Sequence, residues 1–223
     1  MTAVQHSRNS PIISLTFPIV TIRVGSENPV AFNLHRALVC RESARLSKTF
    51  QGAFKESAEQ ECTLSEEDPR IFGYFVEYMY REGWLHDEKS SVHQSELSTL
   101  ARLYTMGDRL IAKGLQDLAL RKIALTLDKT RDLPDQEVCD FLEVAGAEIP
   151  DTPNDDALQA QVLWYAASRL QKLQDFNRFH ELLRQYPHLA VKLCMLAGTK
   201  TNTQPKLPGI SDDKRFKPES IYS

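Results

Sequence analysis

The strongest constraint on the fold is a change of apolar spacing within residues 20–56. Apolar and polar residues first alternate over 20–24 and again over 30–34, which predicts two half-buried strands. The residues between them, Gly-Ser-Glu-Asn-Pro, favour a turn and therefore a hairpin. From His35 onward the apolar residues follow a helical spacing instead. The apolar positions of this helical stretch are Ala37, Leu38, Leu46, Phe50 and Phe54.

A third strand and a further helix are expected next. Residues 60–64 can form a short strand with Cys62 and Leu64 facing inward. Asp68 is a good N-cap and the proline after it suits a first helical turn, so the pair predicts a helix start. Gly83 is placed to end that helix. Its apolar face carries Ile71, Phe72, Phe75, Val76 and Met79. Strands and helices in this order predict an α+β fold.

The rest of the chain has helical spacing. We expect a helix to begin at Pro134, a single helix to carry the stripe from Leu158 to Leu173, and a break at Tyr186-Pro187. The apolar stripe of 158–196 either packs the late helices together, which we favour, or in part holds a partner. The predicted organisation is a flexible arm at 1–17, an α+β domain at 18–128, a helical extension at 129–198 and a disordered tail at 199–223.

Charge and cysteine usage exclude several classes of protein. The 27 basic and 30 acidic side chains are well mixed and give a net charge of -3, whereas nucleic-acid binders concentrate positive charge. The four cysteines fit no zinc pattern. No signal peptide is expected, and no segment approaches the ~20 apolar residues of a membrane span. The sequence therefore predicts a reduced, intracellular protein that binds neither nucleic acid nor membranes.

Motifs for catalysis and for cofactor binding are absent from the sequence, so we expect no enzyme, no cofactor and no metal site. His35 is expected to pack and hydrogen-bond where the hairpin meets the first helix. Cys40 lies near three arginines, which can lower the pKa of a thiol, but a small buried apolar role is favoured. The acidic run of 66–68 is expected to complement a helix dipole. Basic residues of the late helices, Arg169, Lys172, Arg178 and Arg184, are expected on a solvated face.

Three segments resemble blocks of the BTB/POZ domain family. They are FNLHRALVCRES, FQGAFKESAEQECTLSEEDPRIFGYFVEYMY and LARLYTMGDRLIAKGLQDLAL, which stand in the family's order and cover roughly residues 18–128. The match is closest to short members without zinc fingers or kelch repeats. The resemblance implies a small three-stranded sheet capped by helix hairpins, and a function in binding proteins. One departure is Gly107, which stands where the family usually has Ala.

The resemblance also implies interface residues. The family's dimer buries its first helix and N-terminal segment, which would involve Leu38 and Leu46 here. Some adaptors for cullin-type ubiquitin ligases carry a hydrophobic-x-Glu element, which Phe75 to Glu77 would supply. Three functions stay open: a module for self-association (a homodimer) and partner recruitment, a substrate adaptor on a cullin scaffold, and, more weakly, a transcriptional co-regulator.

Overall fold

The computed structural model describes residues 18–53, 55–80, 97–129, 132–151 and 156–198, together with Pro205. The chain divides into two units: unit 1 comprises residues 1–94 and 105–116, and unit 2 comprises residues 95–104 and 117–223. Two helices, α6 (Leu97–Arg109) and α7 (Lys113–Lys129), contribute residues to both units.

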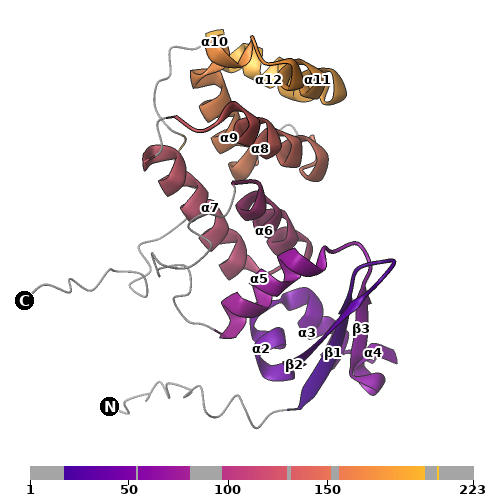
Figure 1. Cartoon of the computed structure of the whole chain (residues 1–223). Helices are drawn as coiled ribbons and strands as arrows, with labels where there is room; N and C mark the ends of the chain where they lie inside the picture. Colours follow the sequence, from indigo (N-terminus) through magenta and orange to yellow (C-terminus); the bar gives the residue numbers. More distant parts are fainter. Residues whose placement is uncertain are drawn as a thin grey trace, which may run out of the picture. The chain divides into compact units, whose positions relative to one another are not determined.

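Unit 1 is built on a three-stranded sheet with the order β2-β1-β3 (Figure 1). The strands are β1 (Ile19–Val24), β2 (Val30–His35) and β3 (Glu61–Leu64). β1 pairs antiparallel with β2 and parallel with β3, so that Ile22 lies opposite both Phe32 and Cys62. The alternation predicted the buried side correctly: Val20, Ile22 and Val24 are all fully buried. The turn into β2 uses Gly25 with φ +100°, a conformation that L side chains rarely adopt.

Short helices complete unit 1 around the sheet. α2 packs on β2, and α4 packs on β3. Between α2 and α3 the chain breaks at Ser43, whose buried hydroxyl accepts from Leu46 N–H (3.1 Å) and donates to the Leu110 carbonyl (2.6 Å). Asp68 caps α5 as predicted, because its Oδ1 accepts from Arg70 N–H at 2.7 Å. These helices are α2 (Arg36–Glu42), α3 (Ala44–Gln51), α4 (Lys55–Glu59) and α5 (Pro69–Tyr80).

Unit 2 is helical in the residues that the structure describes. α9 packs against α12 and α8, and its side chains are buried on several sides rather than along one stripe. α11 packs on α8 and α12. The predicted start at Pro134 and the break at Pro187 are both confirmed. The helices are α8 (Asp135–Glu148), α9 (Ala157–Ser168), α10 (Leu170–Leu173), α11 (Asn177–Gln185) and α12 (Pro187–Gly198).

The prediction of a single helix over 158–173 is wrong. The first helix of this stretch, α9, ends at Ser168, and Arg169 leaves the helical conformation with φ -117° and ψ 10° before α10 begins. The Arg169 guanidinium donates to Tyr165 Oη at 2.9 Å and pairs with Asp132, and these contacts accompany the break. Phe54, the helix end at Gly83, and all of the predicted tail except Pro205 lie outside the described residues.

Candidate protein-interaction surface

An open hollow in unit 1 is the first candidate for a binding surface. Its volume is about 430 Å³ and its lining is predominantly apolar. The lining comes from the residue before β1, from α2 and from the end of α3, and consists of Pro18, Arg36, Ala37, Cys40 and Gln51. Such a lining suits contacts with an apolar side chain of a partner more than proton transfer.

Main-chain and side-chain bonds fix the wall of the hollow. Arg36 N–H donates to the Pro18 carbonyl at 2.9 Å, which ties the start of α2 to the chain before β1. The Arg36 Nη2 atom donates to the Phe50 carbonyl at 2.6 Å. Because the guanidinium is held in this way, the aliphatic part of Arg36 is free to line the hollow.

Two exposed apolar side chains lie at the start of β1 and at the end of α5. Ile19, next to Pro18, is 48% exposed, and Tyr80 is 40% exposed. Tyr80 Oη accepts from His35 N–H at 3.0 Å and lies 2.7 Å from His35 Nδ1, so this histidine has the structural role predicted for it. We call this set the α2 surface: Pro18, Ile19, Arg36, Ala37, Cys40, Gln51 and Tyr80.

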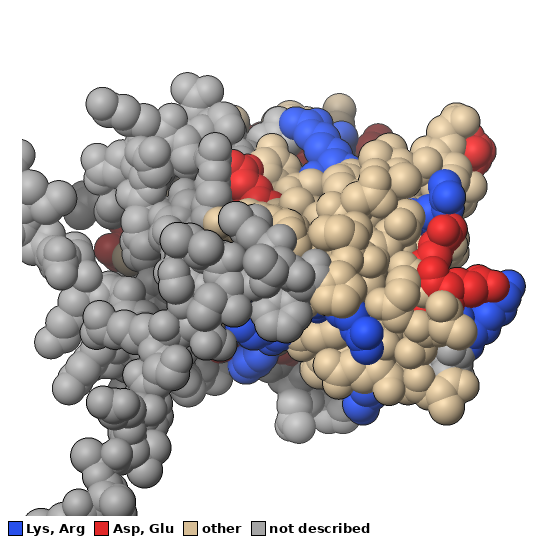
Figure 2. All heavy atoms as spheres, turned by 90° about the horizontal axis from the view of Figure 1, so that it is seen from below, with Lys and Arg blue, Asp and Glu red and all other residues tan. Residues whose placement is uncertain are grey.

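Charge is sparse on the face of the molecule shown in Figure 2. A broad uncharged area there has both basic and acidic side chains around it, with no large patch of one sign among the described residues of this face. Binding to nucleic acid relies on concentrated basic charge, whereas protein interfaces are commonly uncharged at their centre. The character of this face favours a protein partner.

The predicted interface residues lie mostly beneath the surface. Leu38 is 7% exposed, Leu46 is 1% exposed and Phe75 is fully buried, so these side chains support the fold from inside. Phe75 packs edge-on against Phe72 with ring centroids 5.7 Å apart. Glu77 is half-buried on α5. The part that these residues play in an interface stays a prediction.

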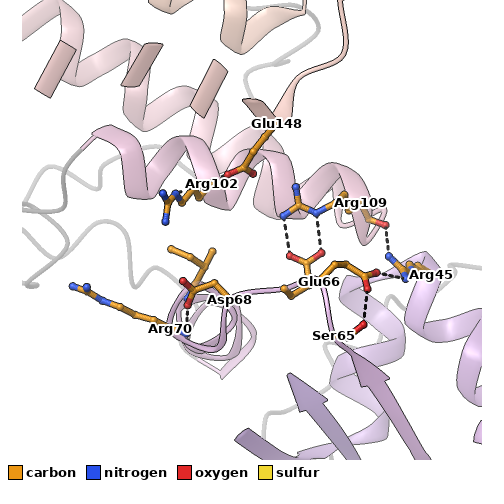
Figure 3. Close-up of polar contacts among 10 residues, drawn as sticks. Arg45, Ser65, Glu66, Asp68, Arg70, Arg102, Arg109 and Glu148 are labelled. Atoms are coloured by element: carbon orange, nitrogen blue, oxygen red, sulfur yellow. Dashed lines mark hydrogen bonds and ion pairs between the residues drawn. The ribbon is translucent and has the colours of Figure 1, made fainter. Parts of the chain in front are cut away.

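Sequence reasoning missed the role of two acidic residues before α5. Glu67 is buried and accepts two hydrogen bonds from Arg109, from Nε at 2.9 Å and from Nη2 at 2.8 Å. Its neighbour Glu66 is exposed and pairs with Arg45 at 3.1 Å, with Ser65 also donating to it (Figure 3). A hydrogen bond from its own main chain, assisted by Arg45, holds the pKa of Glu66 below its ordinary value. Sequence periodicity gives no signal for a contact such as Glu67 with Arg109, which are 42 residues apart. Only the acidic run of 66–68 could therefore be recognised from the sequence.

The cysteines differ in environment. Burial raises the pKa of the Cys62 thiol to about 11, and burial raises the pKa of Cys139 to about 11 as well. Cys40 is half-buried rather than buried, so its predicted place in the core is only partly right, and Cys194 is exposed. Within the described residues no group of His, Cys, Asp and Glu side chains is arranged to hold a metal ion.

Comparison with known proteins agrees with this architecture. The family model of the BTB/POZ domain matches residues 16–123. A protein of Arabidopsis thaliana that is named for its BTB/POZ domain is 27% identical over 167 residues, which cover 74% of this chain and 70% of the relative. The predicted sheet and its helices are thereby confirmed as the fold of this family, followed by a helical region. None of the described helices is long and apolar enough to cross a membrane.

Proposed function

Because the chain carries a BTB/POZ domain over residues 16–123, we propose that it acts by binding proteins, and that it first pairs with a second copy of itself. The observation that supports pairing is the α2 surface, which combines an open apolar hollow with the exposed side chains of Ile19 and Tyr80. Exposed apolar surface of this kind marks interaction sites. A twofold pair is the commonest closed arrangement, because one patch then serves both partners.

We propose no catalytic step and no cofactor for this protein. The BTB/POZ family is one of protein-interaction domains. The polar groups that line the hollow support the same conclusion. The Arg36 guanidinium donates to a main-chain carbonyl, and the other polar groups are the thiol of Cys40 and the amide of Gln51. Such a set offers contacts and shape to a partner.

The test places a charge in the hollow. Ala37 lines the hollow and is half-buried, so Ala37→Glu would bury a carboxylate in the pair without removing a core side chain. An unpaired buried charge costs several kcal/mol, so the dissociation constant should rise by about 100-fold or more. Ala44→Glu is the matched control, because Ala44 is exposed at the first position of α3, where a carboxylate is favourable.

The measurement is the mass in solution, by light scattering over a dilution series. The wild-type chain and Ala44→Glu should be dimers at concentrations where Ala37→Glu is a monomer. A wild-type chain that stays monomeric at every concentration, or an Ala37→Glu variant that pairs as tightly as the control, contradicts the proposal.

A second candidate function is that of a substrate adaptor for a cullin-type ubiquitin ligase. It is favoured by α5, where the buried Phe75 anchors the helix while Val76 and Glu77 remain half-buried and reach the surface. A pull-down with a cullin N-terminal region should capture the wild type and lose Val76→Asp. Failure of the wild type to bind would leave self-association as the surviving function.

A further inference from the structure

The outer edge of β2 is open to a further strand. Among the described strands β2 pairs with β1 alone, so it forms one edge of the sheet (Figure 1). Proteins commonly block such edges with charged residues, with proline or by keeping the strand very short. The opposite edge is blocked in this way, because β3 has four residues and carries Glu61 in an ion pair with Arg23. β2 has six residues, Val-Ala-Phe-Asn-Leu-His, and none of them is Lys, Arg, Asp, Glu, Gly or Pro.

The register of the sheet shows which main-chain groups of β2 point outward. Arg36 N–H donates to the Pro18 carbonyl at 2.9 Å, and this pair continues the register of β1 with β2. Opposite residues of an antiparallel pair alternate between bonded and non-bonded, so the even-numbered residues of β2 turn their main chain toward β1. The N–H and C=O groups of Ala31, Asn33 and His35 therefore point away from the sheet.

The open part of this edge has a limit at each end. His35 N–H donates to Tyr80 Oη at 3.0 Å, so this outward donor is already used. Pro29, just before β2, has no N–H. Between these limits Ala31 and Asn33 are exposed, and within the described part of the chain nothing bonds to their outward main-chain groups. An extended backbone fits these groups, because its own donors and acceptors repeat at the same two-residue spacing.

A second copy of β2 is complementary to this edge when it runs antiparallel, with Phe32 on the twofold axis. Ala31 of each copy then lies opposite Asn33 of the other, and four main-chain hydrogen bonds join the two strands. In the same register His35 lies opposite Pro29 of the second copy. The residue whose N–H is already bonded thus meets the residue that has no N–H, and the pairing leaves neither copy with an unused donor there.

Apolar side chains of β2 support the same register. Val30 lies on the same face of the strand as the buried Leu34, yet it is 45% exposed. Phe32 is half-buried, with its ring edge-on to that of Phe72 at a centroid distance of 5.0 Å. In the antiparallel pair Val30 lies opposite Leu34 of the second copy, and the two Phe32 side chains are neighbours. Cross-strand apolar and aromatic pairs of this kind stabilise sheets.

We propose that the open edge of β2 is a second self-association surface, on which two copies join antiparallel about Phe32 and merge their three-stranded sheets into one. This proposal goes beyond pairing through the α2 surface, because a chain with two different twofold contacts builds an assembly larger than a pair. A contact between single strands is small, and small interfaces are weak. The larger assembly should therefore form only at high protein concentration.

Cysteine cross-linking of the full-length chain tests the register. The native thiols outside the core, Cys40 and Cys194, are first replaced by serine. Residues 31 and 33 of opposite copies should have Cα atoms about 5.5 Å apart, which suits a disulfide. Residue 31 of one copy should lie roughly 7–8 Å from residue 31 of the other, which is too far.

The comparison is between a mixture of two variants and each variant alone. With oxidised glutathione, Ala31→Cys mixed with Asn33→Cys should form a disulfide-linked dimer about tenfold faster or more than either variant by itself. Equal rates in the mixture and in the single variants would overturn the proposal, and would leave the edge to an extended segment of another protein.

Removal of the outward donor tests the contact in solution. Ala31→Pro deletes one N–H in each copy and so two of the four bonds, whereas Ala31→Val keeps the N–H at a similar side-chain size. Proline is tolerated in edge strands where the N–H faces solvent. Both variants carry Ala37→Glu as well, which disables pairing through the α2 surface, so the result does not depend on the proposed function.

The measurement is sedimentation equilibrium at high protein concentration. The dissociation constant should be about tenfold higher or more for Ala31→Pro than for Ala31→Val. Equal constants, or no association of Ala31→Val, would overturn the proposal. If Ala31→Pro does not fold, the cross-linking still decides the question.

Discussion

The adjacent residues Glu66 and Glu67 offer a sharp test of how this fold is stabilised. Both carry the same charge, both precede α5, and both pair with an arginine. They differ in burial: the Glu67 side chain is 1% exposed, whereas the Glu66 side chain is 52% exposed. The same chemical change at the two positions therefore isolates the effect of burial.

Glu67→Gln should destabilise unit 1 by about 2 kcal/mol. Removing one partner of a fully buried ion pair costs about 3–5 kcal/mol, and a hydrogen bond to a charged group contributes about 1.5–3 kcal/mol. The lower part of this range applies, because the Arg109 side chain is 36% exposed and water can solvate it when its partner is lost. The glutamine also directs an NH₂ group at one guanidinium N–H, so one of the two bonds is lost.

Glu66→Gln should change the stability by no more than about 0.5 kcal/mol, because an exposed pair is screened by solvent. The assay is thermal unfolding followed by circular dichroism. For a chain of this size about 2 kcal/mol corresponds to a fall in Tm of roughly 4–8 °C, against about 1–2 °C for the control. Equal falls in Tm for the two variants would refute the reasoning that burial decides the contribution.

Three further predictions concern single positions. Gly107→Ala should lower Tm, because the new Cβ would lie 3.1 Å from a main-chain nitrogen of α7. This close contact should outweigh the helix propensity of alanine, which favours the variant by about 1 kcal/mol. Gly73→Ala is the control and should raise Tm, because the space around Gly73 is open. Lys122→Met should stabilise the protein by on the order of 1 kcal/mol at pH 7, because burial lowers the pKa of Lys122 to about 8 and so penalises its charged form in the folded state. The difference in unfolding free energy between variant and wild type should shrink between about pH 8 and 10.5, and urea titrations at several pH values can follow it. A maleimide at pH 8 should label Cys194 fast and Cys40 more slowly in the folded protein, as mass spectrometry of digests would show. The thiols expected to react only after unfolding are Cys62 and Cys139.

Local signals explain most of what could be predicted from the sequence. The hairpin followed from alternation and from a turn that needs Gly25, and the start of α5 followed from Asp68 and the proline after it. These features depend on residues close together in the chain, so their physical cause is visible in a short stretch. The order of such stretches was enough to indicate the fold of the domain.

Long-range contacts explain what could not be predicted. The helical spacing showed that α2 exists, but the hollow on its outer side depends on Pro18 and Gln51, which lie far from Ala37 in sequence. Leu38 was visible as apolar, yet its place under the surface depends on the sheet behind it. Gly107 was visible only as a departure from the family's usual Ala, whereas the structure shows a close approach of Gln116 on α7 that leaves little room for a Cβ.

The crossing of α6 and α7 between the two units has a practical consequence for dissecting this protein. Each unit is made of two separated stretches of chain, so no single cut releases either of them whole. A fragment ending near residue 128 would keep residues 95–104 and 117–128 of unit 2 while lacking α8 and α9, which belong to the same unit. A deletion phenotype would then report loss of folding rather than loss of one activity. Point variants on the surfaces are the sounder genetic tool.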